Sequence, residues 1–600
     1  MRREFYAILR TPFEGLWRRF SNPGRVLSAR NPAGVPRLLE QVDAAVRDGL
    51  YAAGFVTYEA AGAFGLPVKD AGTLPAACFG LFSPENVESL SRFPAEGRSD
   101  AGEWHPTISH DEYLAAVAAI KDRIAAGDTY QINYTFRLRS AFKGDPRDLM
   151  ANLYSAQAGP WSGYIDTGPH AICSASPELF FIRNAEKVEC HPMKGTAARG
   201  WWPAQDLARG EALQQSEKNR AENVMIVDMV RNDLGRVART GSVAAKPLFA
   251  VARYPLQWQM TSRVSADAPE ATLLELFGAM FPSGSVTGAP KHSAMDIIRE
   301  LESTPRGVYT GAIGYLSPHG RAHFSVAIRT VVVDRKKAEA EFGVGSGVVW
   351  DSVDRDEYDE CLLKAAMLAG SRSPVPGSRF AIAGASGPIP AYVTGEAPEF
   401  EILETMRWAP REGFALLDRH LDRMAASAAC FGFLCDTGEL RTVLQDAVLD
   451  LRRPAKVRLL LGYDGTVACE ALDLTPLPDR PIRAVLASTP IDRSNLFLFH
   501  KTTRREVHEA AKAGRPEAEA VILWNAEGEV TEATDFNVVV EIEGAKVTPP
   551  LDCGLLPGVM REELLERGEI VERRITIAEL RAAPRFWLIN SVRGWVVGTL

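Results

Sequence analysis

Hydrophobic residues recur at helical spacing soon after position 110. Leu114, Val117 and Ile120 follow one another at intervals of three residues, Ser109 can cap the run, and Gly127 can end it. The pattern predicts a helix between Ser109 and Gly127.

Other segments alternate between polar and apolar residues or are rich in β-branched residues, as strands are. In the first two thirds of the chain they are HAICSASPELFFIRN (170–184), TGAIGYLSP (310–318) and HFSVAIRTVVVD (323–334). This mixture predicts an α+β fold with large, mostly antiparallel sheets. In the last third, a helix near 418–432, strands at 456–463 and 536–544 and a helix after Pro557 predict a second α+β fold.

A stretch dense in Gly, Pro, Ser and Ala, without helical or strand periodicity, runs from Gly370 to about Glu399. It predicts a first domain over 1–370, a linker over 371–397 and a second domain over 398–600. Neither part repeats the other, so two different proteins appear in one chain.

Composition narrows the function classes. Hydrophobic residues make up 46% and charged residues 24%, which is globular, and 68 Lys and Arg against 76 Asp and Glu give a net charge of -8. A general nucleic-acid or anionic-membrane binder is disfavoured. The eight cysteines form no CxxC pair, and no stretch is apolar for 18 residues. We expect a cytoplasmic protein without a disulfide framework.

Two segments carry carboxylates at helical spacing. Glu222 lies one turn before the run 224–230, which is apolar except for Asp228, so this helix is expected to be buried on most sides. Glu360 and Lys364 lie on one face of a second helix. Each segment alone is more typical of an ion-paired helix surface. Together they can hold Mg2+, which needs few protein carboxylates.

Three glycine-rich turns allow backbone N–H groups to approach an anion: HPMKGTAARG (191–200), FPSGSVTGAPK (281–291) and FGVGSGVV (342–349). None matches a P-loop or a dinucleotide-binding GxGxxG motif.

The ordered motifs of residues 100–370 resemble the chorismate-utilising enzymes, a family that includes anthranilate synthase component I, isochorismate synthase and aminodeoxychorismate synthase component I. The resemblance implies a two-sheet sandwich, with Glu222 and Glu360 binding Mg2+. The motifs are GDTYQINYTF, SPELF, PMKGT, KNRAENVMIVDMVRNDLGRV, SGSVTGAPK, YTGAIGY, AIRT, GVGSG and EYDECLLKA. The chorismate pocket that it implies is lined by Gly195, Thr196, Tyr309, Arg329, Gly345, Ser346, Gly347 and Lys364.

Three positions favour the aminodeoxychorismate branch. Lys194 stands in PMKGT where the anthranilate and isochorismate enzymes have Ala, and Gln131 replaces the lysine base of the water-adding enzymes. Gln259 replaces a histidine of the anthranilate branch. The resemblance implies that a desolvated Lys194 amine attacks C2 of chorismate while Glu178 protonates the departing 4-hydroxyl, after which ammonia displaces Lys194. A carboxylate anchor is the alternative role of Lys194.

The second part resembles the class IV aminotransferases and the related aminodeoxychorismate lyases over nearly all of 398–600. The segments are HLDR, HKTTRREVHEAA, EVTEATDFNVVV, LPGVMREELLE and NSVRG. The resemblance implies pyridoxal 5'-phosphate (PLP), held covalently by Lys501, paired with Glu532 at its ring nitrogen, and bound at its phosphate by Arg423 and the N–H groups of Val559 and Met560.

Other predicted parts of the PLP site follow the family pattern less closely. Thr405 is predicted to position the substrate carboxylate, and NSVRG with Asn590 resembles a turn on the phosphate side. Phe536-Asn537 stands where the family has Ser-Asn, which puts the contacts behind the cofactor in question.

The fusion predicts 4-aminobenzoate synthesis, a step toward folate: amination of chorismate and then elimination of pyruvate. The alternatives are anthranilate synthase component I joined to a branched-chain or D-amino-acid transaminase, and a regulatory chorismate- or tryptophan-binding protein. No cysteine lies in a GxCxG turn. A separate glutamine amidotransferase subunit is therefore expected as a partner, and a homodimer through the PLP domain is left open.

Overall fold

The computed structural model describes residues 5–368 and 400–600, except 12, 13, 71, 96–99, 158, 185, 255, 256, 478 and 494. Two compact units result: one holds residues 5–199 and 208–368, the other 200–207 and 400–600. The predicted linker 371–397 lies outside the described residues.

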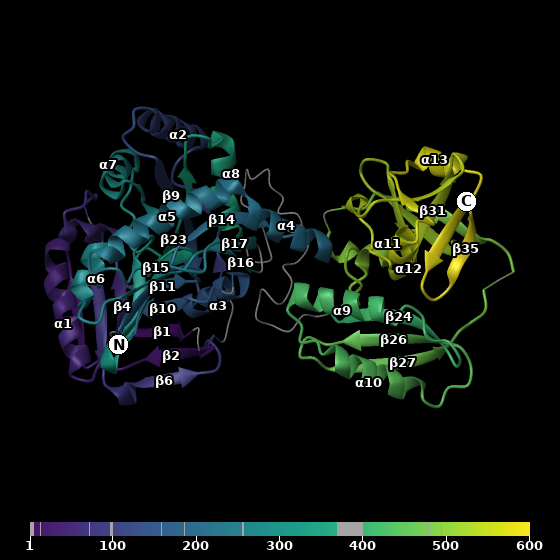
Figure 1. The fold of residues 1–600 in the computed structure, drawn as a ribbon, viewed down its shortest axis with the longest axis horizontal. Coiled ribbons are helices and arrows are strands. Elements are labelled where there is room, and N and C mark those ends of the chain that lie inside the picture. Colours follow the sequence, from purple (N-terminus) through teal and green to yellow (C-terminus); the bar gives the residue numbers. More distant parts are fainter. Residues whose placement is uncertain are drawn as a thin grey trace. The chain divides into compact units, whose positions relative to one another are not determined.

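The first unit contains two large antiparallel sheets, which confirms the predicted fold class (Figure 1). The larger sheet has the order β19 (Gly288–Ala289), β9 (Gln131–Lys143), β23 (Glu339–Val348), β22 (Thr330–Asp334), β11 (His170–Ser174), β10 (Gly163–Asp166), β1 (Tyr6–Thr11), β2 (Leu16–Phe20) and β6 (Val87–Leu90), with β7 (Asp100–Ala101) and β8 (His105–Pro106) also paired to β9.

The second large sheet of this unit has nine strands. Its order is β15 (Ala244–Ala245), β18 (Val264–Asp267), β13 (Lys187–His191), β12 (Leu179–Arg183), β21 (Arg321–Val326), β20 (Ala312–Ser317), β4 (Tyr51–Val56), β5 (Ala77–Phe82) and β3 (Arg25–Ala29). A small sheet of β14 (Met193–Ala198), β17 (Gln257–Thr261) and β16 (Ala250–Arg253) completes the strands that concern the site.

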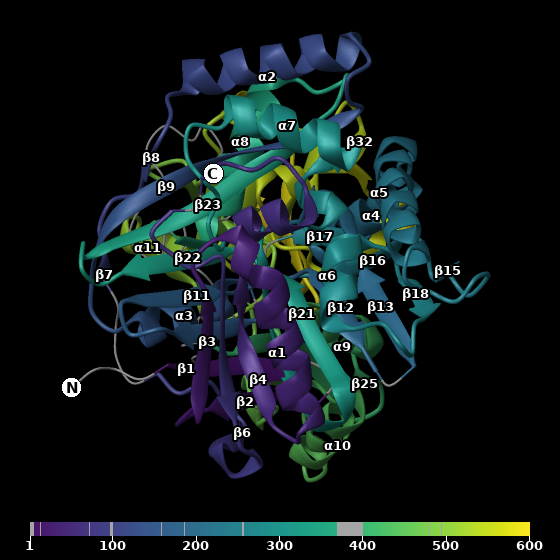
Figure 2. The same cartoon turned by 90° about the vertical axis from the view of Figure 1, so that its left-hand side faces the viewer.

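Helices cover the sheets of the first unit. They are α1 (Val35–Arg47), α2 (His110–Ala125), α3 (Pro146–Gln157), α5 (Glu217–Gly235), α6 (Leu273–Met280), α7 (Lys291–Leu301) and α8 (Asp354–Ala365). Helix α4 (Pro203–Gln215) is divided between the two units, since residues 200–207 belong to the second. In Figures 1 and 2, α2, α7 and α8 lie beside one end of β9 and β23. The helix predicted after Ser109 is confirmed as α2, because Ser109 and Glu112 cap it reciprocally and Gly127 follows with φ +82°.

The buried core of this unit is rich in phenylalanine. Phe181, Phe277 and Phe324 contact one another with ring centroids 5.2–5.8 Å apart. Such pairs add to the free energy of apolar burial. They join β12, β21 and α6, so the strand that follows Glu178 is firmly held.

Helix α5 departs from its prediction. Only one face is buried, through Asn223, Ile226, Val227, Val230 and Leu234, which recur at helical spacing. Asp228 is exposed and pairs with Arg231, with 2.8 Å between Oδ1 and Nη1. The expectation that the helix is buried on most sides is wrong, because the apolar run covers only part of the circumference.

The second unit has a four-stranded and an eight-stranded sheet. The first contains β25 (Gly413–Phe414), β24 (Ile402–Ala409), β26 (Ala455–Leu461) and β27 (Val467–Asp473). The second contains β30 (Val530–Ala533), β29 (Ala520–Trp524), β28 (Ile482–Leu486), β35 (Gly594–Thr599), β34 (Phe586–Asn590), β31 (Phe536–Ile542), β32 (Ala545–Thr548) and β33 (Val571–Glu572).

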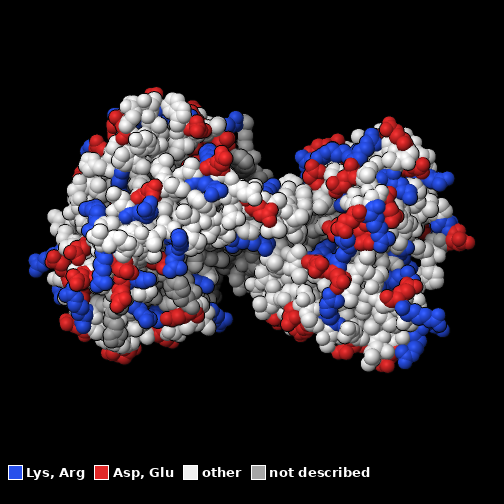
Figure 3. Space-filling model, in the orientation of Figure 1, with Lys and Arg blue, Asp and Glu red and all other residues white. Residues whose placement is uncertain are grey.

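The helices of the second unit are α9 (Leu417–Phe431), α10 (Thr437–Val448), α11 (Glu506–Ala513), α12 (Val559–Glu566) and α13 (Ile577–Ala582). The predicted helices near 418–432 and after Pro557 are thus confirmed as α9 and α12. On the face shown in Figure 3, acidic and basic side chains are interspersed over both units. In the described part of the chain, no helix combines the length and apolarity needed to cross a membrane.

Candidate active sites

One cavity of about 340 Å³ in the first unit brings together residues from all nine of the quoted motifs. Strands β14 and β23 and helices α5 and α8 supply much of its wall. The predicted residues that line it are Glu178, Lys194, Gly195, Thr196, Glu222, Tyr309, Arg329, Gly345, Gly347, Glu360 and Lys364. These residues are up to 186 positions apart in the sequence, so the fold alone makes them neighbours.

Lys194 extends from β14 into this cavity. Its Nζ lies 3.3 Å from Glu222 Oε2 on α5, and a Cβ added at Gly347 would be only 2.4 Å from Nζ. Gln131 lies on the same side, with its amide 3.1 Å from that Cβ position. Gln131 is fully buried, and its amide has no hydrogen-bond partner among the described residues. The glycine therefore leaves space for the amine, beside a buried amide that lacks a hydrogen-bond partner among the described residues.

Glu178 lies just before β12 and has only 3% of its surface exposed. Burial raises the pKa of its carboxyl to about 7, although a hydrogen bond from Ser285 and the nearby Lys194 act in the opposite direction. The Ser285 hydroxyl donates to Glu178 Oε1 at 2.5 Å. A carboxyl with this pKa is about half protonated at pH 7 and can act as a general acid.

A second group of charges lies on the α8 side. Lys364 Nζ is 2.5 Å from Glu360 Oε1 and donates to the Gly345 carbonyl at 2.8 Å. Burial would raise the pKa of Glu360, but Lys364 beside it lowers the pKa below its usual value. Arg329 donates to the Lys364 carbonyl at 2.5 Å, and burial lowers its pKa to about 10. The cavity thus has cations that suit a substrate with carboxylates.

The donor set fits Mg2+. Glu222 and Glu360 reach the same cavity from two helices, and each carboxylate is paired with a lysine amine that neutralises it. Mg2+ prefers one or two carboxylates with water and an anionic ligand at its other positions. These two side chains are the ones that would hold it.

Ser346 departs from its prediction. It is fully buried, and its hydroxyl lies 2.9 Å from the Tyr113 hydroxyl rather than in the cavity. Side chains alternate along a strand, so Gly345 and Gly347 face the cavity and the Ser346 side chain faces away.

Tyr309 is held tightly at the cavity wall. The Arg137 guanidinium lies 5.1 Å from its ring centroid, and a Cβ at Gly343 would be 2.2 Å from the ring. Neither Arg137 nor Ser285 was predicted from the sequence. Ser285 lies inside the quoted SGSVTGAPK motif, whereas nothing in the sequence near Arg137 indicated a contact 172 positions away.

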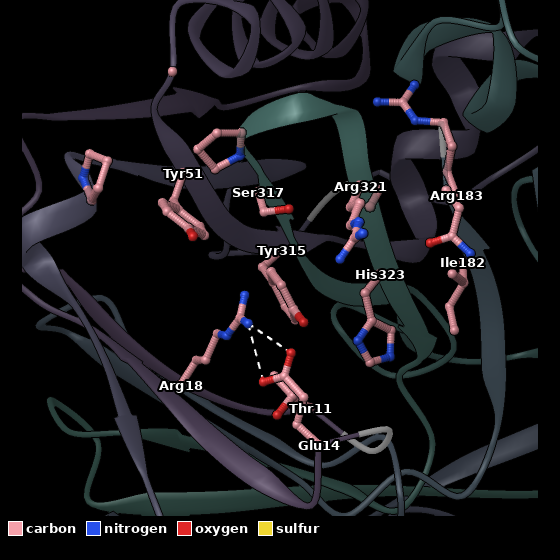
Figure 4. Close-up of a pocket in the computed structure, with 15 residues that line it drawn as sticks. Thr11, Glu14, Arg18, Tyr51, Ile182, Arg183, Tyr315, Ser317, Arg321 and His323 are labelled. Carbon is pink, nitrogen blue, oxygen red and sulfur yellow. Dashed lines mark hydrogen bonds and ion pairs between the residues drawn. The ribbon is translucent and has the colours of Figure 1, made fainter. Parts of the chain in front are cut away.

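A larger cavity of about 900 Å³ lies elsewhere in this unit (Figure 4). Arg18 and Glu14 face each other across 3.0 Å, with Tyr315 and His323 nearby. None of the predicted site residues lines it, so size alone would have indicated the wrong place for the chemistry.

In the second unit, Lys501 lies beside β24, where its carbonyl accepts a hydrogen bond from the Leu403 N–H at 2.9 Å. Burial, and then the positive charge of Arg423, lower the pKa of the Lys501 amine to about 8. An amine with this pKa is partly deprotonated near neutral pH, as Schiff-base formation and proton transfer require.

Glu532 on β30 is 4% exposed at its side chain and bound at both oxygens. His508 Nε2 lies 2.9 Å from Oε1, and the Leu556 N–H donates to Oε2 at 3.1 Å. The carboxylate is therefore fixed in orientation.

Arg423 on α9 is held by a buried carboxylate that was not predicted. Its Nε and Nη2 each donate to Glu404 at 2.8 Å, while Nη1 donates to the Pro557 carbonyl at 2.8 Å. His420 Nδ1 is 2.6 Å from the same Glu404. Burial would raise the pKa of Glu404, but Arg423 and His420 hold it well below its usual range.

Glycine is required where α12 begins. A Cβ at Gly558, the residue before Val559 and Met560, would be 1.8 Å from Asn537 Oδ1. The Asn537 amide donates to the Leu556 carbonyl at 3.0 Å. The turn before α12 is thus joined to Glu532, Asn537 and Arg423, and the departure noted at Phe536 does not remove this contact.

Asn590 and Thr405 are the other two residues of this unit with predicted roles. Asn590 donates to the Asp535 carbonyl and accepts from the N–H groups of Val592 and Arg593, so it shapes the predicted turn. Thr405 follows Glu404 on β24 and projects from the opposite face of the strand. The role of Thr405 at the substrate carboxylate stays a prediction.

The arrangement fits PLP. Lys501, Glu532 and Arg423 occupy the same unit, and Arg423 and Glu532 both contact the turn that begins α12. A helix N-terminus with glycine before it suits a phosphate. Lys501 would bind the cofactor covalently, Glu532 its ring nitrogen, and Arg423 and α12 its phosphate.

Comparison with known proteins gives two family matches. Residues 11–370 match the chorismate binding enzymes, and residues 401–599 match the class IV aminotransferases. Aminodeoxychorismate synthase of Streptomyces griseus is 42% identical over 260 residues, which cover 43% of this chain and 36% of that protein. Aminodeoxychorismate synthase component 1 of Escherichia coli (strain K12) is 36% identical over 275 residues, 46% of this chain and 60% of that protein.

Among solved structures, anthranilate synthase component I from Streptococcus pneumoniae TIGR4 matches with a TM-score of 0.51 and 26% identity, covering 61% of this chain and 92% of that one. The chain spans 36% and 60% of the length of the two synthases named above. The match over residues 11–370 is more than half of the chain. The protein therefore belongs to the chorismate-binding enzymes and carries, after that domain, a class IV aminotransferase domain.

Proposed function

We propose that this chain makes 4-aminobenzoate in two steps, amination of chorismate in the first unit and elimination of pyruvate in the second. The observation that carries the proposal is the pair Lys194 and Glu178: one cavity holds a lysine amine and a buried carboxyl whose pKa of about 7 leaves about half of it protonated at neutral pH. A nucleophile and a general acid are what an addition–displacement at chorismate requires.

In the first step, the Lys194 nitrogen forms a bond to C2 of chorismate, and Glu178 gives its proton to the 4-hydroxyl, which leaves as water. Ammonia then bonds to C4 as the C2–nitrogen bond breaks. Bound Mg2+ would neutralise the substrate's carboxylate. Arg329 and Lys364 supply further positive charge on the α8 side of the cavity.

Two residues favour amination over the family's other reactions. Gln131, which is neutral, occupies the space beside Lys194, so a lysine base that would activate water is missing at this position. Gln259 donates to the Gly195 carbonyl at 3.1 Å and accepts from the Thr196 hydroxyl at 3.3 Å. No imidazole stands there for the proton removal that anthranilate formation needs.

In the second step, Lys501 takes the α-proton of the aminated product, and Glu532 keeps the cofactor's ring nitrogen protonated. When bound, PLP accepts the electrons left by that proton. Expulsion of pyruvate then makes the ring aromatic. Arg423, held by Glu404, would bind the phosphate of PLP.

The test uses the purified full-length chain, chorismate, Mg2+, PLP and an ammonium salt, with products identified by mass. We expect 4-aminobenzoate and pyruvate in equal amounts. The appearance of 2-aminobenzoate would contradict the proposal and favour the anthranilate alternative. Omission of PLP should stop the reaction at the aminated, non-aromatic product.

A further inference from the structure

Two serine hydroxyls continue from Glu178 into the protein. Ser285 Oγ donates to Glu178 Oε1 at 2.5 Å, and Ser283 Oγ lies 2.9 Å from Ser285 Oγ. Glu178 and Ser285 line the chorismate cavity, whereas Ser283 lines a different, smaller pocket. The two hydrogen bonds therefore connect one pocket to the other.

The smaller pocket has about 10 Å³ of free space, room for about one water molecule. Asp233 is its acidic residue, and Lys291 Nζ lies 2.7 Å from the Asp233 carboxylate. Burial raises the pKa of Asp233, while Lys291 lowers it. Its lining is Leu179, Phe180, Cys190, Pro192, Val230, Asp233, Met280, Ser283 and Gly284. A mostly apolar pocket with one carboxylate suits a water that donates to Ser283.

The short helix η4 (Gly284–Val286) that carries these serines is held by side chains from other elements. The Val286 carbonyl accepts from Arg306 Nη1 at 2.7 Å and from the Asn133 amide at 3.2 Å. The Thr287 hydroxyl donates to the Ser283 carbonyl at 3.1 Å. The serine hydroxyls are thus kept in line without a ligand.

If the first unit performs the amination proposed above, Glu178 loses one proton in each turnover and must regain it through a hydrogen-bonded path. Glu178 gives its proton to the departing hydroxyl and is left as a carboxylate. Ammonia enters neutral, because only NH3 has the electron pair that bonds to C4, and the product keeps all three hydrogens as an ammonium group. One proton per turnover must therefore return to Glu178 from solvent.

The groups around Glu178 leave few donors for that proton. Those facing it are Lys194, the Met193 N–H, Ser285 and, farther away, Tyr254. Lys194 is bonded to substrate during the step, and burial raises the pKa of Tyr254 to about 12. At the other end, Asp233 faces Lys291 and Arg236. Ser285 is the donor that also leads to a second pocket.

We propose that Ser285 and Ser283 form a proton relay that reloads Glu178 from the smaller pocket while substrate fills the larger one. A water in that pocket gives a proton to Ser283 Oγ, Ser283 passes its own to Ser285, and Ser285 passes its own to the Glu178 carboxylate. That water takes up one proton from solvent in return, the one that ammonium releases when it becomes NH3, and each hydroxyl gains and loses one proton. Both serines act through Glu178 and are positioning residues.

The test compares Ser283→Ala, Ser283→Thr and the unaltered full-length chain in the amination reaction. Rates are measured with saturating ammonium and Mg2+ in H2O and in D2O, across a pH series. In Ser283→Ala the hydrogen bond from Ser285 to Glu178 remains, so we expect the KM for chorismate and the melting temperature to stay unchanged. We expect kcat to fall about tenfold, less than the roughly 100-fold or more of a lost general acid, because Glu178 itself remains in place. The solvent isotope effect should increase, because proton return becomes rate-limiting.

Ser283→Thr keeps a hydroxyl and should restore both kcat and the isotope effect. Ser293→Ala is the matched control, since that hydroxyl donates to the Asp128 carbonyl, outside both pockets. The relay is refuted if Ser283→Ala keeps the parent kcat and isotope effect. It is also refuted if kcat falls without a change in the isotope effect and Ser283→Thr does not restore it. If the unaltered chain makes no aminated product, the proposed function itself is wrong, and the relay with it.

Discussion

Burial sets the acidity of two groups on which the proposed chemistry depends. It raises the pKa of Glu178 to about 7 and lowers that of Lys501 to about 8. Desolvation disfavours the charged form in both cases, so an acid becomes weaker and a base becomes weaker. A carboxyl and an amine with ordinary pKa values thus become groups that exchange protons near neutral pH.

Replacing Lys194 by Ala should remove the covalent route of amination. At low ammonium concentration we expect the rate to fall by about 100-fold or more, whereas high ammonium should restore part of it by direct attack at C4. Product formation is followed by mass. Lys187→Ala on β13, an exposed lysine outside the cavity, is the control. Unchanged amination by Lys194→Ala at low ammonium would disprove its role as nucleophile.

Glu178 should give the amination a pH limit. The acid must be protonated, so kcat/KM should fall as the pH rises through about 7. Glu178→Gln should lose amination at every pH.

The same substitution should alter stability with pH. The pKa of Glu178 in the folded protein lies above its usual 4.5, so the folded state holds this proton more tightly than the unfolded state. The free energy of unfolding therefore decreases as the pH rises from about 4.5 to about 7. Glu178→Gln has no such loss. Above pH 7 it should be the more stable protein, by up to about 3 kcal/mol, and the difference should disappear near pH 4. A pH-independent difference in melting temperature would contradict the shifted pKa.

Candidate site residues that lie in recognisable motifs could be predicted from the sequence. The residues that hold them in position could not. Lys194, Glu222 and Glu360 were found through PMKGT and the two carboxylate segments, and they do line one cavity. Glu404 was missed because a buried carboxylate in the middle of a strand shows no pattern until Arg423 and His420 are placed against it. Ser346 was misplaced because the motif GVGSG does not show which side chains face the cavity.

Helices could be predicted from capping residues and hydrophobic periodicity where the pattern within the segment itself sets where the helix begins and ends. Helix α2 has both capping residues in its own sequence and was predicted to within a residue at each end. The burial of α5 was overestimated, because the sequence does not show how much of its circumference the sheets cover. The pairing of β9 with β23 over ten residues joins segments about 200 positions apart, which periodicity cannot reveal.

Helix α12 should bind phosphate only while its first turn stays close to Asn537. Gly558→Ala would place a methyl group 1.8 Å from Asn537 Oδ1 and push the turn away. Overpacking of this kind costs about 1–3 kcal/mol, so the affinity for PLP should fall about tenfold or more. PLP binding is measured by titration of the apoprotein. Gly514→Ala is the control, since its Cβ has no neighbour nearer than 3.4 Å. Equal PLP affinity in both variants would contradict this account of the helix start.

In the whole molecule, one substitution should stop the second reaction and leave the first intact. In Lys501→Ala we expect chorismate amination to continue at the parent rate and its product to accumulate, while 4-aminobenzoate formation is lost and borohydride no longer fixes PLP to the chain. Lys546→Ala, in the same unit but stacked near Trp587 and Trp595, should retain both steps. 4-Aminobenzoate formed by Lys501→Ala at the parent rate would refute the assignment of the second unit.

The nitrogen source is a second property of the whole chain. None of the eight cysteines lies in the glycine turn of a glutaminase nucleophile. We expect the purified chain to use ammonium but not glutamine, and to use glutamine once a separate amidotransferase subunit is added. Glutamine-dependent 4-aminobenzoate formation by the chain alone would show that a further hydrolytic site exists within it.

The turn before α12 also limits how this chain can vary. Leu556 donates to Glu532 and accepts from Asn537, while the next carbonyl accepts from Arg423. Three consecutive peptide groups therefore fix the distance between Glu532 and Arg423, the residues proposed to bind the ring nitrogen and the phosphate of PLP. A residue inserted there would break at least one of these three contacts and change that distance. Related chains should differ in the length of many surface loops. The number of residues in the turn that leads to Gly558 and contacts Glu532 should stay constant.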